Sequence, residues 1–174
     1  MIGIFVLFFL LLLGNYIFFL FKVFIGLIKL KSPNVVSSSN IFVSVIVPFR
    51  NESNSILDSL RSLEQQSLDQ MSYEIIYVND QSTDDSFIKL NASISANNVF
   101  VYSLTDEHKL ANKKYAIDYG IEKSKGEIIL LTDADCIHSS GWIESMLCSF
   151  DQNTALVSGP VKYQNGNTVF QKLQ

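Results

Sequence analysis

Asp133 and Asp135 stand one residue apart just after the apolar run 128–131, and their type and spacing suit a metal site. Four consecutive apolar residues bounded by polar ones predict a buried strand, and ligands of α/β folds bind where such strands end. Alternate residues of an extended chain point the same way, so both carboxylates can approach one Mg²⁺ or Mn²⁺ ion, which prefers oxygen ligands together with substrate phosphates. The pair therefore predicts chemistry on a phosphate ester, with a solvated acidic turn as the alternative.

Two further polar clusters follow predicted strands, at residues 48–52 and 79–84. A carboxylate such as Asp80, held at a strand end, can accept hydrogen bonds from a base N–H or from ribose hydroxyls, while the aspartate pair holds a cation that neutralises a diphosphate. The sequence has neither a P-loop nor a Gly-x-Gly-x-x-Gly loop to cradle phosphates, which argues against a P-loop kinase or a nicotinamide enzyme. The clusters together predict a nucleoside diphosphate pocket in which a metal takes over that task.

Strand and helix signals alternate along the chain after residue 40 and place these clusters. Short apolar, β-branched runs predict strands, and segments with one apolar face predict helices. The predicted strands are 41–47, 73–78, 99–102 and 128–131, and the predicted helices are 52–63, a short one through 87–90, 111–121 and 142–150. Repeated β-α units predict an α/β fold, in which a mostly parallel sheet is flanked by helices and the reactive groups gather at the carboxyl ends of the strands.

The first 31 residues differ from the rest in composition. Residues 2–21 carry no formal charge and are nearly all Ile, Leu, Val and Phe. About 20 such residues in a helix cross about 30 Å of hydrocarbon, which predicts one transmembrane helix in a membrane anchor at 1–31. A cleavable signal peptide is the less favoured alternative, because it would need an early basic region and a small-residue cleavage site, and neither is evident before Lys22. The positive-inside tendency predicts a cytoplasmic domain, because three lysines follow the span: Lys22, Lys29 and Lys31.

The rest of the chain reads as a Ser- and Asn-rich linker at 32–40 and one domain at 41–174. That length is enough for a single core. The formal net charge of the chain is -4, so no nucleic acid partner is expected. The spacing of Cys136 and Cys148 fits no metal or disulfide motif, which predicts packing residues in a reducing compartment.

Four motifs, in their order along the chain, resemble family 2 glycosyltransferases. Residues 43–52 resemble the opening strand and Pro-x-x-Asn-Glu turn, residues 77–84 the Asp-x-Ser-x-Asp nucleotide loop, residues 112–116 the Gly-Lys-x-x-Ala segment and residues 133–135 the Asp-x-Asp. Asn112 stands in place of the glycine of the third motif. The resemblance covers residues 42 to about 160, and it implies the GT-A fold, a Rossmann-like sheet that binds nucleotide sugars.

The resemblance implies a role for each matching residue. Asp80 would contact the nucleoside, Asp133 the ribose or the sugar, and Asp135 the divalent metal, Mg²⁺ or Mn²⁺, that bridges the diphosphate oxygens. Lys113 would lie near the donor. The first motif would contribute three more residues to the donor site: Pro48, Asn51 and Glu52.

Nearby side chains have simpler interpretations. His138 follows the aspartate pair and can approach the metal, but a loop histidine without that role is the favoured interpretation. Arg50 can pair with a carboxylate such as Asp80 as readily as with phosphate, and Asp84 can cap a helix instead of binding a ligand. Trp142 is expected to pack its helix against the core.

The expected function is a membrane-anchored glycosyltransferase that moves a sugar from a nucleotide-diphosphate sugar, expected to be a UDP-sugar, to a carbohydrate or lipid-linked acceptor. The resemblance implies a single in-line displacement with inversion, assisted by a metal, and a carboxylate that deprotonates the acceptor hydroxyl. In the resembled family that base belongs to a downstream acidic motif. No residue up to Gln174 is marked as the base, so the catalytic residue is unassigned and the domain is expected to be incomplete. Residues 155–161 resemble the strand that follows the metal loop.

Two alternatives stay open. The chain can be a non-catalytic or truncated membrane module that binds a nucleotide sugar, or a transferase whose acceptor is a lipid phosphate, as in polyprenyl-phosphate sugar transferases. A reading frame that continues past Gln174 would argue against a short, non-catalytic protein. Transfer of labelled sugar into the lipid phase would identify the second.

Overall fold

The computed structural model describes residues 2–29, 41–105, 112–151 and 153–162. These residues belong to two separate compact units, the helix α1 and an α/β domain. Helix α1 spans Ile2–Ile28, and none of its residues is buried. With 27 residues, the helix is long and apolar enough to cross a membrane, judged by its length and composition alone.

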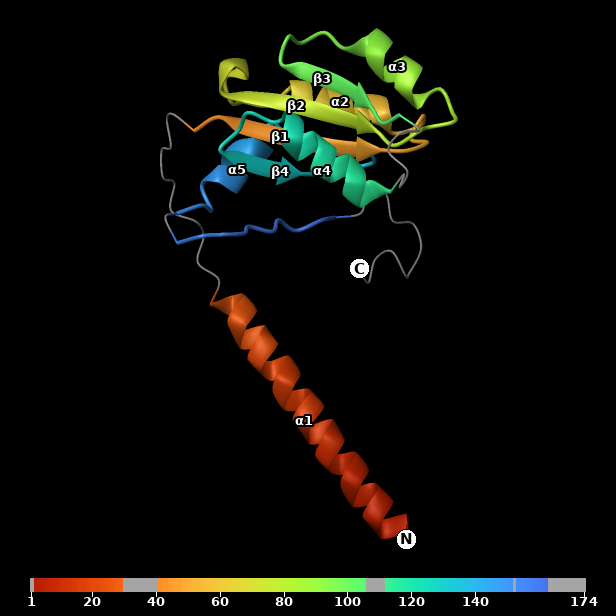
Figure 1. The fold of residues 1–174 in the computed structure, drawn as a ribbon. Coiled ribbons are helices and arrows are strands. Elements are labelled where there is room, and N and C mark those ends of the chain that lie inside the picture. Colours follow the sequence, from red (N-terminus) through yellow and green to blue (C-terminus); the bar gives the residue numbers. More distant parts are fainter. Residues whose placement is uncertain (1, 30–40, 106–111, 152, 163–174) are drawn as a thin grey trace. The chain divides into compact units, whose positions relative to one another are not determined.

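A four-stranded parallel sheet forms the centre of the α/β domain (Figure 1). Its strands lie in the order β3-β2-β1-β4, where β1 is Val43–Phe49, β2 is Tyr73–Asn79, β3 is Val99–Ser103 and β4 is Ile128–Leu131. The register pairs Phe49 with Asn79 and Ile46 with Leu131, so the carboxyl ends of the strands lie at one edge. The predicted α/β fold with a mostly parallel sheet is confirmed.

Helices cover both faces of this sheet. Helix α4 (Lys113–Lys123) contacts β1 and β2 on one face, and α2 (Ile56–Glu64) lies on the other (Figure 1). Two shorter helices, α3 (Ser86–Ser93) and α5 (Trp142–Leu147), contribute apolar side chains to the same core as α2. Among the described residues, the remaining helical segment is the single turn η1, Gln70–Ser72.

The two central strands separate two layers of core because alternate side chains point to opposite faces. All seven residues of β1 and of β2 are buried. Val45 and Tyr77 belong to the larger cluster, on the side of α2, whereas Val78 packs with Ala116 of α4 on the other side. Helix α4 comes very close to the sheet at Gly120, where a Cβ atom would lie 2.6 Å from Ile46 Cγ2. This close contact sets the position of the helix that begins with Lys113.

Some element bounds differ from those expected. Helix α2 begins at Ile56 instead of residue 52, because the residues before it form a turn in which the N–H groups of Ser55 and Ile56 donate to Glu52 O at 3.1 and 2.9 Å. Helix α4 begins after Asn112, whose Oδ1 accepts a hydrogen bond from Tyr115 N at 2.9 Å, and residue 111 lies outside the described residues. Helix α5 ends at Leu147, short of residue 150.

The expectation of a strand at 155–161 is wrong. The structure describes residues 153–162 and assigns no strand among them. Leu156 and Val161 are 85% and 79% exposed, so the apolar residues that suggested a strand contribute nothing to the described core. A strand forms only where a neighbour accepts and donates its backbone hydrogen bonds, and Pro160 has no N–H to donate.

Candidate functional site

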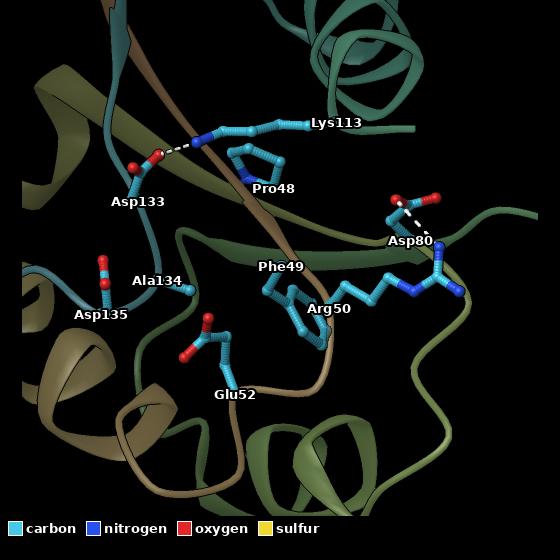
Figure 2. A pocket seen from close by; sticks show the side chains of 9 residues that line it. All are labelled: Pro48, Phe49, Arg50, Glu52, Asp80, Lys113, Asp133, Ala134 and Asp135. Atoms are coloured by element: carbon cyan, nitrogen blue, oxygen red, sulfur yellow. Dashed lines mark hydrogen bonds and ion pairs between the residues drawn. The ribbon is translucent and has the colours of Figure 1, made fainter. Parts of the chain in front are cut away.

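A pocket with a volume of about 210 Å³ lies at the carboxyl ends of β1, β2 and β4. Six of the seven residues that the sequence predicted for the donor and metal sites line it together: Pro48, Glu52, Asp80, Lys113, Asp133 and Asp135 (Figure 2). They come from segments up to 87 positions apart in the chain, the span from residue 48 to residue 135. Their convergence follows from the parallel sheet, which brings the ends of its strands to one edge.

Asn51 is the exception, because it does not line the pocket. Its φ of 58° is left-handed, and its Oδ1 accepts hydrogen bonds from Thr83 N at 2.7 Å and from Asp84 N at 3.4 Å. In return, Asn51 N donates to Ser82 Oγ at 3.1 Å. These contacts join the loop after β1 to the loop after β2. In this structure, Asn51 therefore positions the residues on either side of it.

Asp80 is the most buried charged residue of the pocket, with 5% of its surface exposed. Its backbone N–H donates to Phe49 O at 2.8 Å, which fixes its position beside the end of β1. The carboxylate lies 3.9 Å from Arg50 Nη1 through Oδ2, whereas Oδ1 is buried and has no hydrogen-bond partner among the described residues. A buried acceptor without a partner is costly, so Oδ1 marks a place where a ligand can donate a hydrogen bond.

Asp133 and Asp135 follow β4, and Ala134 between them is buried. Asp133 Oδ1 accepts a hydrogen bond from Lys113 Nζ at 2.6 Å, although both side chains are more than half exposed. The side-chain contact of Asp135 is a weak one, from Cys136 Sγ at 3.7 Å. Figure 2 shows the carboxylate of Glu52 on the same side of the pocket as Ala134. Glu52 Oε2 also accepts a hydrogen bond from Ser55 Oγ at 2.6 Å, which agrees with a role in holding its loop.

The pocket carries an excess of negative charge. Four carboxylates line it against two cationic side chains, Arg50 and Lys113. A diphosphate placed here would meet this excess, which a divalent cation would offset.

The donor set fits a metal ion that is completed by a substrate. Among the described residues, no three His, Cys, Asp or Glu side chains form a ready-made metal site. Mg²⁺ is commonly held by one or two carboxylates together with substrate phosphates and water. Asp133 and Asp135 supply carboxylates of that number and kind, and both line the pocket.

His138 and Trp142 lie beside the loop that carries the aspartates. His138 Nε2 is 2.8 Å from Thr132 Oγ1, and its ring stacks on Trp142 with centroids 4.0 Å apart. Burial lowers the pKa of His138, which favours the neutral ring. Trp142 packs against the larger core cluster, and neither residue lines the pocket. These contacts agree with the simpler interpretation of both residues.

Asp84 and Gln66 support the site from outside. The N-cap residue of α3 is Asp85, not Asp84, but Asp84 Oδ1 accepts a hydrogen bond from Ser86 N, the first residue of the helix, at 3.1 Å. Gln66, in contrast, had no signal in the sequence. Its Nε2 donates to Ser139 O at 2.9 Å and its Oε1 accepts from Ile143 N at 3.1 Å, so it ties the end of α2 to the segment after the aspartates. This contact joins residues 73 positions apart, which no local pattern reveals.

Comparison with known proteins gives one family. Residues 44–174 match the family described as Glycosyl transferase family 2. A similar relative is the dolichyl-phosphate beta-glucosyltransferase ALG5C of Trichomonas vaginalis, 33% identical over 116 residues, which are 62% of this chain and 33% of that protein. The chain spans less than half the length of the curated relatives it matches.

Two solved structures share the fold. The mannosyltransferase PcManGT of Pyrobaculum calidifontis, in complex with GDP-Man and Mn²⁺, has a TM-score of 0.70 and 20% identity, over 82% of this chain and 41% of its own. TarS of S. aureus, residues 1–349 in complex with UDP, has a TM-score of 0.53 and 25% identity, over 60% of this chain and 30% of its own.

Proposed function

The chain belongs to glycosyl transferase family 2, and from that membership we propose that it binds the sugar donor of a membrane-bound glycosyltransferase. The donor is a nucleoside diphosphate sugar, and the acceptor is lipid-linked. The observation that carries this proposal is the pocket itself, where an unpartnered buried carboxylate oxygen of Asp80 and the exposed carboxylates of Asp133 and Asp135 meet at one sheet edge.

The buried end of the pocket suits the nucleoside. Asp80 Oδ1 is positioned to accept a hydrogen bond from a base N–H or a ribose hydroxyl, and such a charge-assisted bond is strong when it excludes water. Arg50 lies beside the same carboxylate, at 3.9 Å, and is half exposed, so it can also contact a phosphate. Pro48 and Phe49 complete this side of the pocket with apolar surface.

The exposed end of the pocket suits the diphosphate. Asp135 would hold a divalent cation, with Asp133 contacting the ribose or the sugar and Lys113 close to the diphosphate. When bound, Mg²⁺ or Mn²⁺ would stabilise the negative charge that develops on the departing nucleoside diphosphate. The Mn²⁺ and GDP-Man in the structure of PcManGT support this assignment, and the UDP in that of TarS supports a uridine nucleotide as a second candidate.

Transfer with inversion needs a carboxylate that deprotonates the acceptor hydroxyl. Two carboxylates after the aspartate pair, Glu144 and Asp151, each accept a hydrogen bond from a protein hydroxyl, and neither lines the pocket. Glu144 Oε2 accepts from Ser67 Oγ at 2.9 Å, and Asp151 Oδ1 accepts from Thr154 Oγ1 at 2.6 Å. We therefore assign the base to neither residue, and we place donor binding in this chain without assigning the acceptor site.

The membrane part of the proposal rests on α1. Its 27 residues, most of them apolar, suit a single span, and the lysines at 22, 29 and 31 would place the α/β domain in the cytoplasm. The name of the Trichomonas relative, a dolichyl-phosphate glucosyltransferase, supports a lipid phosphate as acceptor. An anchored domain and a lipid-linked acceptor would share one surface, which raises their local concentration.

Calorimetric titration of the full chain in detergent micelles tests donor binding. UDP-glucose, UDP-GlcNAc and GDP-mannose are titrated with and without Mn²⁺ into the wild type, Asp135→Asn and Asp118→Asn. Asp118 lies exposed on α4 outside the pocket, so its variant is the matched control for the loss of one carboxylate. We expect metal-dependent binding of at least one donor, weakened at least about tenfold in Asp135→Asn, in line with the loss of a charged contact, and unchanged in Asp118→Asn.

Equal binding by both variants would refute the metal role of Asp135, and no binding by the folded wild type would refute the donor site. Transfer of radiolabelled sugar into extracted lipid then separates a transferase from a non-catalytic binding module. Binding without transfer would favour the module.

A further inference from the structure

A short ion pair crosses the exposed end of the pocket. Lys113 Nζ lies 2.6 Å from Asp133 Oδ1, and Figure 2 shows the lysine side chain extended toward this carboxylate. Lys113 is the first residue of α4, directly after its N-cap Asn112, and Asp133 follows β4. The two side chains are 61% and 54% exposed, so the ammonium group can move to another anion without disturbing the core.

The two aspartates of the pocket therefore differ in their charge balance. Asp133 is paired with an ammonium group, whereas Asp135 forms no ion pair within the described residues. An ammonium group and a divalent cation both bind carboxylate oxygens, and two positive charges at such short range repel each other. A cation that approaches this pair of aspartates thus meets Lys113 as a competitor.

We propose that Lys113 is the resting counter-ion of Asp133, and that it leaves this carboxylate for the donor diphosphate when metal and donor bind together. The inference deepens the proposed function, since it rests on a metal-assisted donor site. In the free protein the ammonium weakens cation binding. With a diphosphate present, the same ammonium gains a second anion and the repulsion is relieved.

The consequence is a coupling between metal and donor. Each ligand raises the affinity of the protein for the other by the same factor, because linkage is reciprocal. Lys113 increases this factor, because its ammonium group weakens the binding of the cation alone but favours the binding of the cation together with the diphosphate. The domain then discriminates against metal binding without donor.

Mn²⁺ binding to the full chain in detergent micelles, without nucleotide, tests the first half of the proposal, that Lys113 competes with the cation. Free Mn²⁺ is measured by electron paramagnetic resonance for the wild type, Lys113→Met and Lys114→Met. The control removes the same charge from the next residue of α4, which is exposed and forms no ion pair within the described residues. Exposed ion pairs change an equilibrium constant by up to about fivefold, so we expect Lys113→Met to bind Mn²⁺ about three- to fivefold more tightly than the wild type. Lys114→Met should stay within about twofold, the effect of one distant, screened charge.

The second half is tested by repeating the titrations with UDP and with GDP at saturation. The increase in Mn²⁺ affinity caused by the nucleotide should be at least about threefold smaller in Lys113→Met than in the wild type and in Lys114→Met, by the same ion-pair argument. If Lys113→Met without nucleotide binds Mn²⁺ no more tightly than the wild type, the competition between Lys113 and the cation is overturned. The absence of Mn²⁺ binding in both the wild type and Lys113→Met overturns it as well.

If the nucleotide increases the Mn²⁺ affinity of Lys113→Met as much as that of the wild type, the exchange of Lys113 to the diphosphate is overturned. If neither nucleotide binds the wild type, the proposed donor site and the exchange both fail, whereas the nucleotide-free titrations still decide whether Lys113 competes with the cation. The thermal unfolding of all three proteins, followed by Trp142 fluorescence, shows that each is folded.

Discussion

Replacement of Gly126 by alanine is expected to destabilise the α/β domain, because this residue touches the backbone of β1, one of the two central strands. A Cβ atom at Gly126 would lie 2.7 Å from Ser44 Oγ and 2.8 Å from the carbonyl carbon of Val43, and closer still to Ser44 N. Two of these three neighbours are backbone atoms, which cannot move aside by a change of rotamer. The connection from α4 to β4 must therefore shift away from the sheet.

The size of the effect follows from the bonds that this shift would break. Three hydrogen bonds hold the connection: Lys125 N to Glu74 Oε1 at 2.7 Å, Gly126 N to Ser44 Oγ at 2.8 Å and Glu127 N to Phe42 O at 2.9 Å. Glu74 is 3% exposed, and its Oε1 accepts hydrogen bonds from Lys125 N and from Ser44 Oγ. The loss of one such bond costs about 1 kcal/mol, and a buried group left without its partner costs about 1–3 kcal/mol more, which gives a total of about 2–4 kcal/mol.

Thermal unfolding followed by the fluorescence of Trp142, the single tryptophan, reports on this domain alone. For a domain of roughly 130 residues, 1 kcal/mol corresponds to about 3.5 °C, so Tm should fall by about 7–14 °C. Gly141→Ala is the matched control, because a Cβ there meets nothing within 4 Å. Since Gly141 is the N-cap of α5, the control should lose less than about 1 kcal/mol. A Tm for Gly126→Ala equal to that of the control would refute the reasoning.

Two further variants test the core and the loops. The buried hydroxyl of Tyr77 lies 3.0 Å from Ser59 Oγ, and burial raises the pKa of Tyr77 above its ordinary value of 10.0, so the folded protein keeps a proton that the unfolded chain loses. The resulting stability is complete below pH 10.0 and is lost as the pH rises above it. In urea unfolding, the free energy of unfolding of Tyr77→Phe should therefore fall less steeply at alkaline pH than that of the wild type, and at pH 7 it should be about 1 kcal/mol lower. An identical alkaline decline in both proteins would contradict the buried phenol. Asn51→Ala should weaken the metal-dependent binding of UDP or GDP, because alanine lacks the carbonyl that joins the two loops and adopts the φ of 58° at a cost of about 1–2 kcal/mol. Titration calorimetry measures this effect, and an unchanged affinity would show that the joined loops are not required.

The sequence alone was sufficient for the fold class and for most of the residues in the pocket. Apolar runs such as Ile128–Leu131 mark strands by their length and flanks, and alternation with helical segments implies a parallel sheet. Once the strands are parallel, their carboxyl ends share an edge whatever the details of packing. Asp80 and Asp133 were therefore predictable neighbours, although they are 53 positions apart.

The tertiary structure decided what these side chains do within the pocket. Asn51 joins two loops instead of lining the pocket, Asp133 is paired with Lys113, and one oxygen of Asp80 has no partner in the part of the chain that the structure describes. The strand expected at 155–161 is absent from the described residues because a strand depends on a neighbour. Each of these outcomes depends on hydrogen bonds and charges that meet only when distant segments pack. Local periodicity records which residues face the core, but the partner of each polar side chain is set by the fold.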